Sequence, residues 1–139
     1  MTFEETDETS GLWIENHTGY DIIQRMMYVF VQLLAFTAKT RRLGLTLEDL
    51  RGIENEISGD PTGWPVMKGT GGLRKMRFAP ERQRGGKSGG LRVCYFVMDS
   101  ASHVYLVTLF AKNEQDNLTK AECAAIARLI GQIKALHRK

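Results

Sequence analysis

The sequence predicts an α+β domain: a small antiparallel β-sheet, two helices from the N-terminal half of the chain, and one C-terminal helix. Three observations lead to this class. Apolar residues recur at helical spacing in region 32–57 and again after Thr119. Three runs between them have the alternating or continuous apolar pattern of strands. Turns rich in Gly and Pro separate these segments, and 139 residues suffice for one modest core.

The N-terminal segment differs in composition from the rest of the chain. Residues 1–25 contain six acidic residues and one basic residue, with few apolar residues and no clear period. We expect residues 1–27 to form an acidic appendage that is flexible at its start, and residues 28–139 to form the domain. Leu12, Trp13 and Ile14 could dock locally. An acidic segment that folds onto a basic surface of the same chain is an alternative.

Two helices are predicted in tandem after a short β-prone run at 28–31. The first helical pattern covers 32–43, where Gly44 is a plausible stop. Thr46 then begins the second helix, with Asp49 three residues later in the spacing of a capping box. This second helix has its apolar positions at Leu47, Leu50, Ile53 and Ile57.

The period changes to that of strands after a Pro- and Gly-rich loop at 59–72. Residues 73–79 alternate, so that Lys75 and Arg77 fall on one face and apolar residues on the other. A basic loop at 80–90 follows. Residues 91–98 and 104–111 are nearly continuous apolar runs, typical of central strands, and 99–102 form the turn between them.

The last helix begins at Thr119, where Glu122 completes a second capping-box spacing. Its apolar positions recur at helical period and indicate a buried stripe. They are Cys123, Ile126, Ala127, Ile130 and Ile133. The predicted element order is therefore β-α-α-β-β-β-α, with the helices on one face of the sheet.

Composition excludes several classes of function. Cys94 and Cys123 lie in a strand pattern and a helical pattern, which favours reduced core thiols over a disulfide bridge. No Cys/His cluster has metal-ligand spacing, so we expect neither a metal nor a cofactor. The start of the chain is acidic, unlike a secretory signal, and the apolar stretch at 26–38 is too short to span a bilayer. We expect a cytoplasmic protein without membrane contact.

Positive charge is concentrated in one part of the chain. Between residues 68 and 92 there are eight basic residues and one acidic residue, although the formal net charge of the whole chain is only +3. Antiparallel pairing of the second and third strands would bring several of these cations together. Such a surface favours a polyanion, with RNA or DNA first, over the alternative of a merely solvated face. The basic residues are Lys68, Arg74, Lys75, Arg77, Arg82, Arg84, Lys87 and Arg92.

Three separated motifs, at 69–77, 86–96 and 105–114, occur in an order that resembles the RelE/HigB superfamily of bacterial toxins, and most closely its HigB-like branch. The resemblance covers roughly residues 28–137. It implies a RelE-like fold and a toxin of a type II toxin–antitoxin system. It also implies that the toxin cleaves messenger RNA in the ribosomal A site. The implied partners are the ribosome, mRNA and a cognate antitoxin, which we expect to be a helix-turn-helix protein.

The resemblance also implies roles for individual residues. Lys75 and Arg77 match a basic pair on the second strand, Arg92 matches an arginine on the third, and Lys112 matches a lysine after the fourth. Asn113 stands where some relatives have arginine, and Thr119 where some have tyrosine near the last helix, which leaves the general acid open. The catalytic candidates are Lys75, Arg77, Arg92 and Glu114. The RNA-binding candidates are Arg74, Arg82, Arg84, Lys87, Lys112 and Asn113.

The implied chemistry needs no metal. Attack by the RNA's own 2′-hydroxyl requires a base, cations to stabilise the phosphorane, and an acid for the leaving oxygen. Arg77 and Arg92 suit the second task because guanidinium groups bind phosphate oxygens in pairs. Lys75 or Glu114 could transfer the proton, and Glu114 could equally be an ion-pair partner of Lys112 or Arg92. The alternative function is a non-catalytic nucleic-acid-binding module, or a degenerate toxin that only binds an antitoxin.

Overall fold

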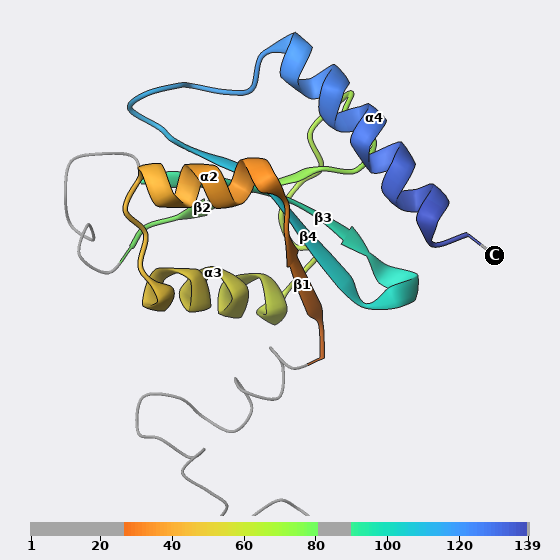
Figure 1. Cartoon of the computed structure of the whole chain (residues 1–139), viewed down its shortest axis with the longest axis horizontal. Helices are drawn as coiled ribbons and strands as arrows, with labels where there is room; N and C mark the ends of the chain where they lie inside the picture. The colour runs from red at the N-terminus through yellow and green to blue at the C-terminus, as the bar shows by residue number, and fades with distance from the viewer. Residues whose placement is uncertain (1–26, 81–89, 139) are drawn as a thin grey trace, which may run out of the picture.

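The computed structural model describes residues 27–80 and 90–138. It has the predicted element order, with three helices and a four-stranded sheet, and the α+β class is confirmed (Figure 1). The strands are β1 (Val29–Gln32), β2 (Arg74–Phe78), β3 (Leu91–Met98) and β4 (His103–Ala111). The helices are α2 (Leu34–Arg42), α3 (Leu47–Gly59) and α4 (Lys120–Leu136).

The sheet is mixed, so the expectation of a fully antiparallel sheet was wrong for one strand. The strand order is β1-β4-β3-β2, and both β2–β3 and β3–β4 are antiparallel. Strand β1 runs parallel to β4, with Val29 opposite His103 and Gln32 opposite Leu106. Hairpin connections force antiparallel pairing only between strands adjacent in sequence. Strand β1 is separated from β4 by two helices and two strands, so its direction cannot be read from such a connection.

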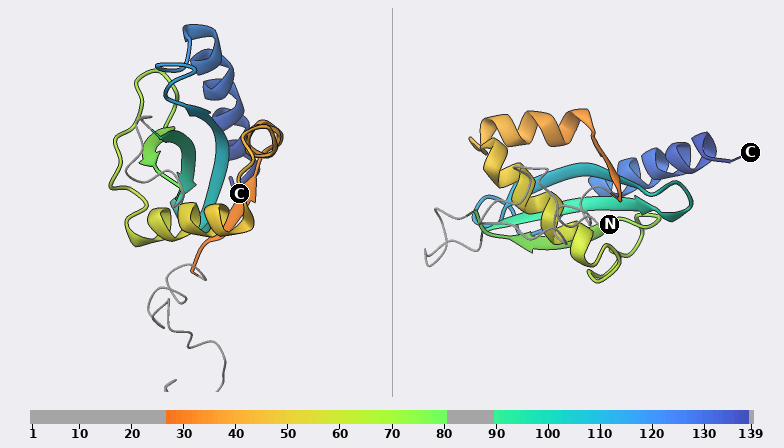
Figure 2. Two further views of the ribbon diagram at one scale, coloured as in Figure 1. Left: turned by 90° about the vertical axis from the view of Figure 1, so that its left-hand side faces the viewer. Right: turned by 90° about the horizontal axis from the view of Figure 1, so that it is seen from below.

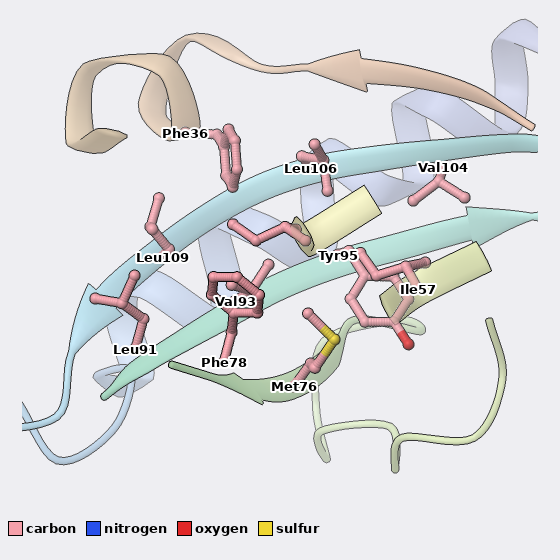
Figure 3. Packing of buried hydrophobic residues seen from close by; sticks show 11 residues of the cluster. Phe36, Ile57, Met76, Phe78, Leu91, Val93, Tyr95, Val104, Leu106 and Leu109 are labelled. Carbon is pink, nitrogen blue, oxygen red and sulfur yellow. The ribbon is translucent and has the colours of Figure 1, made fainter. Parts of the chain in front are cut away.

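Helices cover both faces of the sheet, which corrects the expectation that they share one face (Figure 2). One buried cluster joins the sheet to α3 and to Phe36 of α2, and Figure 3 shows its side chains. A second cluster joins the opposite face to Ile126, Ile130 and Ile133 of α4. The apolar residues of β3 and β4 are nearly continuous because these strands are buried on both sides.

A bulge in β4 sets which residues face α4. Cys94 is opposite Thr108 and Tyr95 is opposite Leu106, so Val107 is left as the extra residue of β4. Leu106 and Leu109 consequently both belong to the cluster on the α3 side.

Both predicted capping boxes are present. The Thr46 hydroxyl accepts from the Asp49 backbone N–H at 3.1 Å, and the Asp49 carboxylate accepts from the Thr46 N–H at 2.9 Å. Thr119 and Glu122 make the same reciprocal pair at the start of α4, at 3.1 and 2.7 Å. These contacts satisfy backbone donors that a helix N-terminus leaves without partners. Gly44 follows α2 with φ +71°, a conformation that favours glycine.

The Gly69–Gly72 turn connects the long loop to β2 and packs against α4. The buried Thr70 hydroxyl donates to Met67 O at 2.7 Å and accepts from Leu73 N at 3.0 Å. Gly72 has φ +131°, and a Cβ there would lie 3.0 Å from the Phe96 ring. The glycines of this first motif therefore serve backbone shape and close packing.

The Ser58 hydroxyl of α3 is a weak point in the core. The side chain is buried, and its oxygen makes no hydrogen bond within the described residues. We expect Ser58→Ala to raise the free energy of unfolding by about 1 kcal/mol, because it removes an unsatisfied polar atom and favours the helix. Urea denaturation measures this change. Ser100→Ala, at an exposed position, should change stability by less than about 0.5 kcal/mol. A lower free energy of unfolding in Ser58→Ala would contradict the assignment of the Ser58 hydroxyl as a buried group without a hydrogen bond in the described part of the chain.

Other expectations concern the N-terminal segment and the membrane. Residues 1–26, with Leu12, Trp13 and Ile14, lie outside the described residues, so the domain boundary near residue 27 stays a prediction. Among the described helices, none is long and apolar enough to cross a bilayer. Cys94 and Cys123 are unbridged, the first buried and the second half-buried.

Candidate nucleic-acid interface

The basic pair of β2 lies on the α4 side of the sheet. Lys75 and Arg77 alternate with the buried Met76 and Phe78, which face the α3 side. The pleat therefore separates a basic front from an apolar back, as the sequence pattern predicted. Cys94 of β3 is directly opposite Lys75 in the antiparallel pairing.

Two arginines face each other across the β2–β3 pair. Arg77 is directly opposite Arg92, and Phe110 of β4 follows Arg92 in the same row. Cβ atoms of directly opposed residues are about 5 Å apart, and like charges in such a position are unfavourable. Arg77 is exposed and Arg92 half-buried. The register places both arginine side chains in one row on the same face of the sheet, and guanidinium groups bind phosphate oxygens in pairs, so this row is suited to a phosphate group.

The segment that follows β4 borders these cations. The Lys112 backbone N–H donates to Gly90 O at 3.0 Å, which extends the β3–β4 pairing by one residue. By alternation with Phe110, Lys112 lies on the α4 side, and its ammonium pairs with Asp116 at 3.1 Å. Asn113 is exposed. We call the four cations Lys75, Arg77, Arg92 and Lys112 the basic face.

Asn117 is a neighbour of the basic face that sequence reasoning missed. Its side-chain oxygen accepts from the Lys75 ammonium at 3.2 Å and from the Leu118 backbone N–H at 2.9 Å. Gln115 donates both to Asn117 O at 2.8 Å and to the Glu122 carboxylate at 3.2 Å. The lysine is thereby linked to the cap of α4. The residues around Asn117 have no period, so the sequence offered no signal for this contact.

Glu114 lies beside α2 and binds a residue that was not among its expected partners. Its two carboxylate oxygens accept from the Arg42 guanidinium at 3.2 and 3.4 Å. The partners suggested from the sequence were Lys112 and Arg92. Both side chains are about half exposed, at 55% for Arg42 and 48% for Glu114, so the pair contributes little to stability. The contact nevertheless occupies the carboxylate proposed for proton transfer.

Arg74 is not on the basic face. It shares the α3 side with Met76, and its guanidinium donates to the carbonyls of Thr62 and Trp64. These contacts hold the long loop against the edge strand, and the role of Arg74 as an RNA contact stays a prediction. Trp64 of that loop was also missed from sequence, and the Arg77 Cζ lies 6.0 Å from its ring centroid. Arg82, Arg84 and Lys87 lie outside the described residues.

The thiol of Cys94 has low reactivity, although Cys94 is directly opposite Lys75. Burial raises the pKa of this thiol to about 12, and the opposing effect of the nearby Lys75 and Lys39 ammonium groups is smaller. A protonated, buried thiol is a poor nucleophile. Over residues 27–80 and 90–138, no group of three or more His, Cys, Asp and Glu side chains could hold a metal ion. The basic face itself offers guanidinium and ammonium groups, which bind anions.

Comparisons with known proteins bear on the fold. No model of a known protein family matches the chain. Among solved structures, a mutant of the E. coli toxin RelE in the free state is similar, with a TM-score of 0.50 and 18% sequence identity. The match covers 70% of this chain and 95% of that one. The protein thus belongs to the α+β class with a small mixed sheet. Its particular fold is RelE-like.

Proposed function

We propose that this protein is a ribosome-dependent mRNA endonuclease toxin of a type II toxin–antitoxin system, of the HigB-like kind. The observation that carries the proposal is the direct opposition of Arg77 and Arg92 on a RelE-like sheet, with Lys75 and Lys112 beside them. A phosphate that reaches both guanidinium groups gains charge-assisted hydrogen bonds from each of them.

The proposed reaction is cleavage of RNA by its own 2′-hydroxyl. Arg77 and Arg92 would stabilise the charge that develops on the phosphorane. Lys75, which Asn117 positions, is the preferred candidate for proton transfer. Glu114 is less favoured because Arg42 binds its carboxylate.

The remaining basic and polar residues would position the RNA strand. Lys112 and Asn113 lie at the end of β4 beside the arginine pair. Arg82, Arg84 and Lys87 lie between β2 and β3 in the sequence, and we propose them as phosphate contacts on charge alone. Phosphate contacts fix a strand without reading its bases. Positioning of the mRNA would therefore depend on the ribosome.

The proposal includes an antitoxin as partner. A small open reading frame for a helix-turn-helix protein next to this gene is the expected source. Co-expression with the product of that frame should restore growth that the protein alone arrests.

The decisive experiment incubates purified protein with mRNA engaged on ribosomes and, in parallel, with the same mRNA free in solution. Primer extension should show new 5′ ends at A-site codons only in the ribosome sample. Salt-sensitive binding of RNA without new ends would instead support the alternative of a non-catalytic binding module, because phosphate contacts weaken with salt whether or not cleavage follows. A protein that neither binds nor cleaves RNA in this assay would contradict both the endonuclease proposal and the alternative of an RNA-binding module.

A further inference from the structure

An apolar groove lies between α2 and α4, over β4. Its volume is about 630 Å³. Figure 2 shows the two helices flanking this part of the sheet. The lining is mainly apolar, with Lys39 and Glu122 as its charged members. Representative apolar residues are Leu33, Leu34, Val107, Ala125 and Leu129.

The groove exposes apolar surface that a folded chain ordinarily covers. Leu34 is 89% exposed, although it lies in the first turn of α2 beside the buried face of the sheet. Exposed apolar surface collected in one concave place marks a binding site more often than single exposed residues do.

The chain contains a segment whose apolar residues fit this groove. Leu12, Trp13 and Ile14 are three consecutive bulky apolar residues in an otherwise acidic stretch. The linker from Glu15 to Tyr28 spans at most about 50 Å when extended. Strand β1 leads directly to Leu33 and Leu34 at the groove and covers only about 13 Å. The linker is therefore long enough to return along β1 and reach the groove.

Charge favours the same arrangement. Residues 1–25 carry six acidic residues and one basic residue, which leaves 18 basic and 10 acidic residues in the remainder of the chain. The groove is next to the basic face. Thr108 lines it and shares a row with Cys94 and Lys75, while Leu118 lines it and directly follows Asn117. Acidic residues on either side of a docked segment would come close to these cations.

We propose that residues Leu12–Ile14 of this chain bind in the groove between α2 and α4. The acidic residues that flank them then lie against the basic face and compete with a polyanion for it. This is an intramolecular contact that would shield the basic face. It does not depend on whether the protein cleaves RNA, because it concerns only the groove and the charge of the basic face.

The contact can be followed in the full-length chain by ¹⁹F NMR after incorporation of 5-fluorotryptophan. The sequence has only two tryptophans, Trp13 and Trp64, and Trp13→Phe assigns the two signals. We expect the Trp13 signal to lie away from its position in urea. Leu34→Glu should return it to that position, because a carboxylate in the groove opposes binding of an apolar, acidic segment.

Leu136→Glu is the matched control, since Leu136 is 80% exposed and does not line the groove. It should leave the Trp13 signal unchanged, and an unchanged Trp64 signal in both variants shows that the fold is kept. A Trp13 signal at its unfolded position in the unmodified chain overturns the proposal. So does a signal that Leu34→Glu leaves in place. A Trp13 shift that grows with protein concentration also overturns it, because a second copy would then be the occupant.

A second measurement tests the shielding. The affinity for a short single-stranded RNA oligonucleotide at low salt should rise at least about threefold in Leu34→Glu relative to Leu136→Glu. Equal RNA affinities of the two variants would show that the acidic N-terminal residues do not compete with RNA for the basic face.

Discussion

Replacing Arg92 with alanine is expected to lower the rate of ribosome-dependent mRNA cleavage at least tenfold, while the fold is kept. Removal of a group that stabilises developing charge typically costs about 100-fold or more, and the opposed Arg77 would retain part of that stabilisation. The rate is measured by primer extension on programmed ribosomes with excess protein. Circular dichroism and urea denaturation establish that the variant is folded.

Arg128→Ala is the matched control because Arg128 is an exposed arginine of α4 outside the basic face. It should cleave at the unmodified rate. Arg92→Lys keeps the charge but loses the paired donors of guanidinium. Its cleavage rate should therefore lie between those of the alanine variant and the unmodified protein. An Arg92→Ala rate equal to that of the control would remove Arg92 from the mechanism.

Replacing Phe36 with alanine is expected to lower the free energy of unfolding by about 3–5 kcal/mol. Phe36 is fully buried and is the large apolar residue by which α2 reaches the core on the α3 side (Figure 3). Truncation loses its apolar burial and leaves a cavity. Urea denaturation at constant pH measures the change.

Leu47→Ala provides the comparison for this loss, because Leu47 is 63% exposed at the start of α3. It should cost less than about 0.5 kcal/mol. If the two variants lost similar stability, the packing of α2 through Phe36 would be wrong.

The sequence predicted those features that depend on local chemistry. Thr46 and Thr119 marked two helix starts because their capping contacts involve residues only three positions away. The alternation of Lys75 and Arg77 with apolar residues placed the basic pair on one face because the side-chain period of a strand is two. Antiparallel pairing of these consecutive strands was predicted as well, whereas the register that places Arg92 opposite Arg77 comes from the structure.

Features set by distant contacts were not predictable in this way. The direction of β1 depends on how the chain returns after two helices, and no local pattern encodes it. Arg74 looks like its basic neighbours in sequence, yet its place in the pleat turns it towards the loop carbonyls. Asn117 reaches Lys75 from 42 positions away through a segment without periodicity. Residues of one chemical type thus acquire different roles from the face on which they lie.

The sheet separates two regions that can evolve under different constraints. Its α3 side contains one of the buried clusters, the unsatisfied Ser58 hydroxyl and none of the four cations of the basic face. Its α4 side contains all four cations and the groove. Substitutions on the α3 side can therefore raise stability without altering the surface that meets a ligand. Stability gained there would offset the cost of substitutions in the charged surface on the opposite side.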